Sequence, residues 1–247
     1  MNLKNICSLI ALIAGLIGFT QTATNAQQAS GNIPDITGSW ERARDPSIPA
    51  QSQPPLKAQY LKEWQAKMQA IREANAKGQP IAERVVSCLP DGMPGMMAGP
   101  FPMEVLQSKG QVTVIQEAYT QVRRILLDHP AKTVDDVEPG FYGFSVGHWD
   151  KGTLTVDTIG VREDVTYQNV PHSKDMHIKE RFSLGSNGLL LDEITIEDPT
   201  HLEKPWTFTF GFRRMADYQL LEYICEDNRE YADEKGVQQI RIPSTTR

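Results

Sequence analysis

The sequence predicts an all-β fold, a closed antiparallel barrel of about 8–10 strands, with a β-sandwich as the alternative. Short runs of alternating apolar and polar residues follow one another from residue 104 onward, and turn-forming residues separate them. No helical pattern lies between these runs, which argues against a parallel sheet. The expected strands in this part are Glu104–Ser108, Val112–Tyr119, Gln121–Leu127, Tyr142–Trp149, Leu154–Ile159, Ile178–Leu184, Leu189–Glu197, Trp206–Arg213 and Gln219–Cys225.

The N-terminus has the features of a secretory signal. Lys4 supplies a positive charge, Ile6–Phe19 is an apolar run too short to span a membrane comfortably, and Ala26 is a suitable cleavage site. We therefore expect residues 1–26 to be a signal peptide and residues 27–247 a single barrel domain that is periplasmic or secreted. Cys7 lies within the apolar run and not at a lipid-attachment position, so we expect no membrane anchor.

The charge of the chain restricts its partners. The chain has 247 residues and a formal charge of −6, from 25 basic and 31 acidic side chains. An acidic protein is poorly suited to nucleic acid or to an anionic membrane. We expect a small apolar or aromatic molecule as the partner, and the oligomeric state stays open.

Two cysteines remain after the signal segment, Cys88 and Cys225. In an exported protein the simplest interpretation is one disulfide, because an oxidising compartment disfavours free thiols. Two separate buried thiols are the alternative.

One segment, residues 55–77, has a helical pattern. Leu56, Tyr60, Trp64 and Met68 recur at four-residue steps, Lys and Glu fill the opposite face, and Gly78 follows. We expect one N-terminal amphipathic helix that packs across the barrel mouth or against its outer wall.

Residues 88–103 form a segment rich in Met, Pro and Gly that is too broken for regular structure. Its apolar, pliable side chains, Met96 and Met97 among them, suit a lid over a ligand, a soft-donor Cu(I) site, or gap-filling packing beside Cys88. No His or Cys clusters with the Met residues, so packing is favoured over copper.

Two short motifs resemble those of the lipocalin and calycin barrels. Gly38-x-Trp40 enters the first strand, and Ala216-Asp217-Tyr218 precedes a late strand where lipocalins often carry Thr-Asp-Tyr. A longer set of motifs is similar to a family of exported bacterial proteins: Cys88-x-Pro-x-Gly-Met-Pro94, His148-Trp149, Thr153-Leu-x-Val-Asp-Thr158, Pro171-His-Ser173 and Ile196-Glu-Asp-Pro199. The resemblance implies export and a lipocalin-like barrel, and it implies no substrate.

Glu180 is the charge that the pattern least explains. Alternation places it on one strand face with Met176, Ile178, Phe182 and Leu184, and a buried Glu is rare unless it is paired or functional. A carboxyl group in an apolar cavity holds its proton more tightly and can act as a general acid or base. An ion pair with an inward Arg is the alternative.

Other polar and aromatic residues complete the candidate site. His172 is the expected acid–base partner of Glu180, and Arg124 or Arg181 would pair with the Glu180 carboxylate or hold an anionic oxygen. His148 shares a face with Phe144 and Val146, so it is expected to be buried and hydrogen-bonded and is a further catalytic candidate. Asp157 is expected on a solvated face. The expected ligand-binding residues are Trp149, His177, Trp206, Phe208, Phe210, Met96 and Met97.

No cofactor or metal is expected. His177 and Glu180 point to opposite faces of a strand, and no His pair has zinc-site spacing. The sequence contains no P-loop, dinucleotide fingerprint or Gly-x-Ser-x-Gly motif.

Three functions fit these residues. The first is a cofactor-independent lyase, isomerase or hydratase that acts on an apolar small molecule inside the barrel. The second is a non-catalytic carrier or binding protein of the lipocalin type, and the third is a structural domain with a filled interior.

Overall fold

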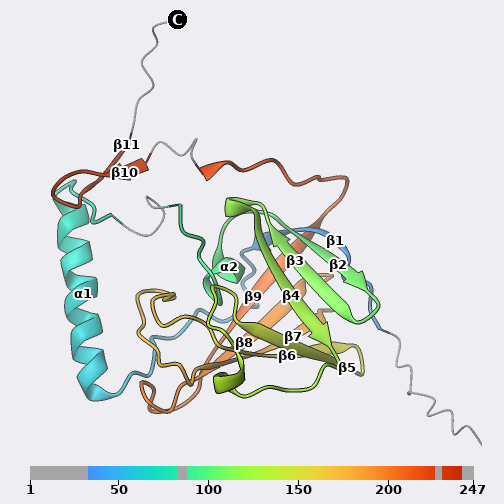
Figure 1. The fold of residues 1–247 in the computed structure, drawn as a ribbon. Helices are drawn as coiled ribbons and strands as arrows, with labels where there is room; N and C mark the ends of the chain where they lie inside the picture. The colour runs from blue at the N-terminus through green and yellow to red at the C-terminus, as the bar shows by residue number, and fades with distance from the viewer. Residues whose placement is uncertain (1–32, 83–87, 226–229, 241–247) are drawn as a thin grey trace, which may run out of the picture. The chain divides into compact units, whose positions relative to one another are not determined.

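Nine strands close into a barrel in the computed structural model, which describes residues 33–82, 88–225 and 230–240 (Figure 1). The expected signal segment, residues 1–26, lies outside the described residues. The barrel strands are β1 (Gly38–Ala43), β2 (Met103–Ser108), β3 (Gln111–Gln116), β4 (Gln121–Leu127), β5 (Phe144–Asp150), β6 (Thr153–Ile159), β7 (His177–Leu184), β8 (Leu190–Glu197) and β9 (Trp206–Met215). The remaining elements are the helices α1 (Ala58–Ala76) and α2 (Gly95–Ala98), the short 3₁₀ turns η2 (Ala118–Thr120) and η3 (Val134–Asp136), and the small hairpin β10 (Glu230–Ala232) with β11 (Gln238–Ile240).

The barrel is mixed, which corrects the expectation of a wholly antiparallel sheet. Each strand pairs with the next, and β9 returns to β1, but β4 and β5 run parallel, with Ile125 opposite Ser145. A parallel pair needs a crossover, because the chain must return to the end of the barrel at which β4 began. Residues 128–143 make that return.

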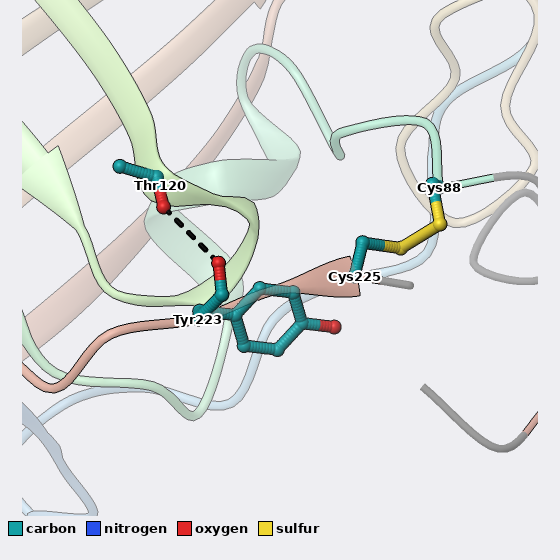
Figure 2. The surroundings of a disulfide bond; sticks show 4 residues. All are labelled: Cys88, Thr120, Tyr223 and Cys225. Atoms are coloured by element: carbon teal, nitrogen blue, oxygen red, sulfur yellow. Dashed lines mark hydrogen bonds between the residues drawn. A yellow bond between two sulfur atoms is a disulfide. The ribbon is translucent and has the colours of Figure 1, made fainter. Parts of the chain in front are cut away.

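Most expected strands are confirmed, but the strand expected at residues 219–225 is wrong. This segment is not part of the barrel, and Leu221 and Ile224 are 67% and 49% exposed. Its apolar alternation therefore faces solvent, and Tyr223 accepts a hydrogen bond from Thr120 through its backbone carbonyl (Figure 2). The strand expected at 112–119 ends early, at Gln116, because the chain turns into η2.

The Cys88–Cys225 disulfide is confirmed, with the two Cα atoms 5.6 Å apart (Figure 2). It joins the start of the Met-rich segment to the end of the chain segment that follows β9. Met93, Met96 and Met97 are almost completely buried in the core, and Gln116 donates a side-chain hydrogen bond to the Met96 carbonyl. These contacts favour gap-filling packing of this segment.

Helix α1 confirms the expected helix and packs against two loops. None of its residues is fully buried, but Tyr60, Leu61 and Trp64 pack against the core. The Tyr60 ring lies 4.1 Å from the ring of His201, and the Trp64 indole donates to the backbone carbonyl of Gln168 at 3.0 Å. Within the described part of the chain, no helix is both long and apolar enough to cross a membrane.

The core is the interior of the barrel, into which every second side chain of each strand projects. Trp40 of the Gly-x-Trp motif is buried, donates to the Ile36 carbonyl at 2.9 Å and stacks under the Arg214 guanidinium at 4.3 Å. The alternating aromatic residues of β9 are buried and form an aromatic wall: Trp206, Phe208, Phe210 and Phe212. The closed barrel is compatible with the fold that the lipocalin resemblance implied.

Candidate functional site

A buried ion pair crosses the barrel interior between β4 and β7. The Arg123 guanidinium engages both carboxylate oxygens of Glu180, with Nη1 and Oε1 2.7 Å apart, and neither side chain is exposed. Arg123 also donates to the hydroxyl groups of Ser145 at 3.2 Å and Thr158 at 3.0 Å, and these two hydroxyls lie 2.8 Å apart. The pair is therefore fully desolvated and fully hydrogen-bonded.

Glu180 points inward as expected, but its partner is neither Arg124 nor Arg181. Arg124 is exposed on the outer face of β4, and Arg181 is exposed on β7, 3.8 Å from Glu193. The inward residue is Arg123, since Gln121, Arg123 and Ile125 share the buried face. This face carries two long polar residues, so the alternation of β4 gave no apolar stripe to identify it.

A second interior carboxyl group, Asp192 on β8, has no hydrogen-bond partner. Its side chain is completely buried, and both its oxygens lack a partner. Burial raises the pKa of Asp192 well above its usual value, and the negative charge of Glu180 adds to this effect, while the charges of Arg123 and Arg42 oppose it. Sequence reasoning missed Asp192 because acids occur on both faces of β8, although its inward neighbours Leu190 and Ile194 are apolar.

Arg42, on β1, is a half-buried cation that lies against the aromatic wall. Its guanidinium carbon lies 4.0 Å from the centre of the Phe210 ring, and its buried Nη1 has no hydrogen-bond partner. Phe210 is also the cross-strand neighbour of Asp192. An unpaired acid and an unpaired guanidinium nitrogen therefore flank one aromatic side chain inside the barrel.

A loop side chain, Tyr167, covers the aromatic wall. Its ring lies 5.9, 5.5 and 6.4 Å from the rings of Trp206, Phe208 and Phe210. Its hydroxyl donates to Gln51 Oε1 at 2.9 Å and receives a hydrogen bond from Gln168 at 3.2 Å. Burial raises the pKa of Tyr167, whereas these hydrogen bonds and the charge of Arg42 lower it.

A small cavity of about 20 Å³ lies beside Tyr167, at the end of the barrel where β8 ends and β9 begins. Loops cover this end, which we call the capped end. Three chain segments enclose it: the Met-rich segment, residues 160–176 and residues 198–205. Its lining side chains include Pro94, Val165, His172, Met176, Ile196 and Trp206.

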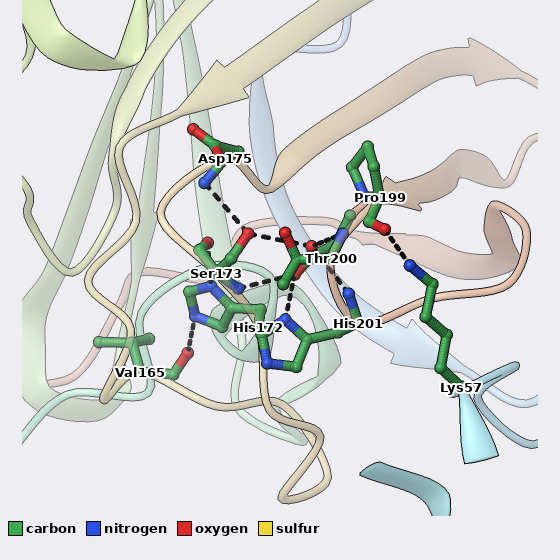
Figure 3. A network of polar contacts seen from close by, with 9 residues as sticks. Lys57, Val165, His172, Ser173, Asp175, Pro199, Thr200 and His201 are labelled. Carbon is green, nitrogen blue, oxygen red and sulfur yellow. Dashed lines mark hydrogen bonds and ion pairs between the residues drawn. The ribbon is translucent and has the colours of Figure 1, made fainter. Parts of the chain in front are cut away.

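Asp198 anchors the loops around this cavity. It accepts hydrogen bonds from the backbone and hydroxyl of Ser173, at 2.7 and 3.0 Å, and from the backbone nitrogens of Thr200 and His201. Burial alone would raise the pKa of Asp198, but these hydrogen bonds outweigh burial and leave it below its usual value. Figure 3 shows Ser173, Thr200 and His201 gathered at this junction, where Lys57 also reaches the Pro199 carbonyl.

His172 belongs to the same junction and does not meet Glu180. Its ring nitrogens lie 3.0 Å from the Ser173 carbonyl oxygen and 2.9 Å from the Val165 carbonyl oxygen (Figure 3). Backbone carbonyls therefore engage both nitrogens, and the expected His172–Glu180 acid–base pair is not formed. These contacts make His172 a residue that holds the loop.

The remaining candidate His residues lie outside the barrel. His148 is exposed, contrary to the expectation of burial, and contacts Asp128 at 2.5 Å, because Ser145 and Gly147 occupy the inward face of β5. His177 contacts Asp157 at 3.1 Å on the outer face, where Asp157 is exposed as expected. Trp149 is half-buried and packs against the core.

An open groove of about 620 Å³ runs along this outer face, between residues 128–132 and strands β5, β6 and β7. Phe144 and Val146 line it, and the Lys132 amine lies 4.7 Å from the centre of the Phe144 ring. The groove is separate from the interior ion pair, because the Glu180 side chain has no exposed surface.

The described residues contain no group of three or more His, Cys, Asp or Glu side chains placed to hold a metal ion. No protein-family model matches the sequence, and no curated protein matches it. Function is therefore inferred from the side chains of the barrel interior and its capped end.

Proposed function

We propose that the protein binds a small apolar or aromatic molecule inside the capped end of its barrel. The observation that carries this proposal is a set of buried polar atoms without protein partners: both oxygens of Asp192, Nη1 of Arg42 and Nε2 of Gln51. The large majority of buried side-chain polar atoms in proteins are paired, and an unpaired one costs roughly 1–3 kcal/mol. Here they lie beside an aromatic wall, an arrangement typical of ligand sites.

The position of Tyr167 supports the same proposal. Its ring belongs to a loop and not to a barrel strand, yet it packs on three aromatic residues of β9. Movement of this loop would expose an aromatic surface, and the polar groups of Asp192 and Arg42 lie beside its Phe210 ring. The protein would then be a lipocalin-like carrier or binding protein.

Proton transfer on the bound molecule is a second candidate function, favoured by the raised pKa of Asp192. A carboxyl group whose pKa is raised keeps its proton to higher pH and can act as a general acid in elimination, isomerisation or hydration. Asp192 suits this role better than Glu180, since Arg123 engages both oxygens of Glu180. His172 takes no part in this version of the mechanism.

Export remains part of the proposal. The Cys88–Cys225 disulfide is consistent with an oxidising compartment, and such bonds are rare in the cytosol. A cleaved N-terminus after Ala26 in protein recovered from the periplasm or medium is the expected result, and intracellular protein with an intact N-terminus would contradict it.

The binding proposal is tested with the full chain and two matched acid substitutions. Asp192→Leu removes the interior carboxyl group, and Asp157→Leu removes an exposed one on the outer face. Small molecules carried through purification are extracted and identified by mass spectrometry, and their affinity is then measured by calorimetry. We expect at least a tenfold loss of affinity for Asp192→Leu only. Equal affinity in both variants, or no molecule binding to a folded wild-type protein, would overturn the proposal.

Asp192→Asn separates the carrier from the enzyme. The amide keeps a hydrogen-bond donor and an acceptor at the same place but cannot release a proton. Retained binding with lost turnover supports proton transfer. Retained binding with no chemical change in the molecule for either protein supports the carrier.

A further inference from the structure

We propose that Tyr167 is an internal occupant of the binding site, and that the molecule which displaces it is a small phenol. This inference rests on the proposed function and names both the ligand class and the way in which the site is kept closed. The capped end of the barrel already holds a phenol ring, that of Tyr167, on an aromatic wall.

The surroundings of Tyr167 satisfy a hydroxyl group as well as a ring. The hydroxyl donates to Gln51 Oε1 and accepts from Gln168 Nε2, and the side chains of these two residues also contact each other at 3.1 Å. The buried Nε2 of Gln51 still lacks an acceptor. Gln51 lies outside the turn that carries Tyr167, so it stays in place for the hydroxyl of an incoming phenol. A benzene ring without the hydroxyl would leave the Gln51 side chain with fewer partners, and such loss of pairing is how polar sites reject analogues.

The charge in the site also suits a phenol. The Arg42 guanidinium stacks on Phe210 at 4.0 Å, and its positive charge partly offsets the burial that raises the pKa of the Tyr167 hydroxyl. A cation near an aromatic hydroxyl stabilises negative charge on its oxygen. The site therefore favours a hydroxylated ring over a plain hydrocarbon.

The turn that carries Tyr167 is strained, which makes its displacement feasible. The Val170 amide donates a hydrogen bond to the Tyr167 carbonyl at 3.0 Å. The two residues between them, Gln168 and Asn169, have φ angles of 51° and 59°. The left-handed region is unfavourable for an L-residue such as Gln, whereas Asn tolerates it better. The hydrogen bond from Trp64 of α1 to the Gln168 carbonyl helps to hold this strained turn closed.

The test uses two probes of the same shape, 4-methylphenol and 1,4-dimethylbenzene, with wild-type protein. In hydrogen exchange, we expect 4-methylphenol to reduce protection of the Val170 amide, since this amide is bonded to the Tyr167 carbonyl. We expect the dimethylbenzene to have at least a tenfold weaker effect. Binding of 4-methylphenol with an unchanged Val170 amide would show that Tyr167 is not displaced, and it would overturn the inference.

Two variants separate the steps of the inference. Tyr167→Ala removes the internal occupant and should bind 4-methylphenol at least tenfold more tightly than wild type. Trp64→Phe keeps the ring, removes the hydrogen bond that holds the turn, and should increase the affinity roughly fivefold, as loss of about 1 kcal/mol predicts. Trp64→Phe also keeps the test open if Tyr167→Ala does not fold.

The outcomes distinguish this inference from the proposed function. Equal affinity for the two probes in the variants would overturn the phenol class and leave small-molecule binding standing. Failure of every folded protein to bind either probe, or any molecule recovered from purification, would overturn both.

Discussion

Glu180→Gln should destabilise the protein strongly, because it leaves the Arg123 guanidinium buried without its counter-charge. Both side chains are fully buried, and the neighbouring hydroxyls of Ser145 and Thr158 are neutral. Removing one partner of a buried ion pair costs about 3–5 kcal/mol. In a domain of this size each kcal/mol lowers Tm by about 2–4 °C, so we expect a fall of about 6–20 °C.

The loss in Glu180→Gln should also depend on pH through Asp192. The Glu180 charge raises the pKa of Asp192, so its removal lowers that pKa and lets Asp192 ionise and serve Arg123 in its place. The destabilisation should therefore become smaller as pH rises through the pKa of Asp192 in the variant. The double variant Glu180→Gln/Asp192→Asn lacks both acids and should show the full loss across the same pH range.

A double-mutant cycle measures the pair by urea unfolding. Arg123→Met and Glu180→Leu should each cost about 3–5 kcal/mol, but the combined variant should recover most of this loss, because apolar residues of similar volume often replace a buried pair without cost. Arg181→Met, on the exposed face, is the matched control and should change stability by less than about 1 kcal/mol. Losses below about 1 kcal/mol for both single interior variants, with no coupling, would refute the burial argument.

Three further predictions concern other parts of the chain. The raised pKa of Asp192 means that the folded state holds a proton which the unfolded chain loses near pH 4, so stability falls as pH rises from about 4 through the folded-state pKa. Asp192→Asn should consequently be more stable than wild type at pH 7 and similar at pH 3 in urea titrations, and an equal difference at both would contradict this. Replacing Cys88 and Cys225 by Ser should lower stability by about 2–5 kcal/mol, and a mass shift on alkylation of unreduced protein would show that the bond is absent. Gln168→Gly should be about 1 kcal/mol more stable than Gln168→Ala, because both lose the side chain and only Gly relieves the positive φ, so an equal Tm would remove the argument for strain.

The barrel strands could be predicted because one face of each is buried and two-residue alternation reports that directly. Glu180 was identified in this way, as the single acid on an otherwise apolar face. The same logic failed for Arg123, whose strand carries Gln121 on the inward face as well, and for Asp192, whose neighbour Glu193 has the same charge on the opposite face. Where both faces contain polar residues, alternation does not say which of them is inside.

Long-range features left no periodic signal at all. The parallel pairing of β4 with β5 follows from the route of residues 128–143 around the barrel, not from the pattern of either strand. Tyr167 lies in a loop without alternation, so only the assembled fold brings it to the aromatic wall of β9. The segment at 219–225 shows the opposite failure, since an apolar pattern occurs there without a sheet partner.

The charges inside the barrel indicate what kind of ligand the proposed site would favour. Arg42 and Arg123 are cations, and Glu180 balances Arg123 through two hydrogen bonds. Burial and the charge of Glu180 both favour the protonated form of Asp192, so while Asp192 keeps its proton the interior has one unbalanced positive charge, at Arg42. That charge is partly desolvated, since burial lowers the pKa of the half-buried Arg42 and its Nη1 has no partner. A ligand that brings a negatively polarised oxygen beside Phe210 would supply the missing counter-charge, and a plain hydrocarbon of the same shape would not. The electrostatics of the barrel interior and the hydrogen bonds around Tyr167 would both favour the phenol proposed above.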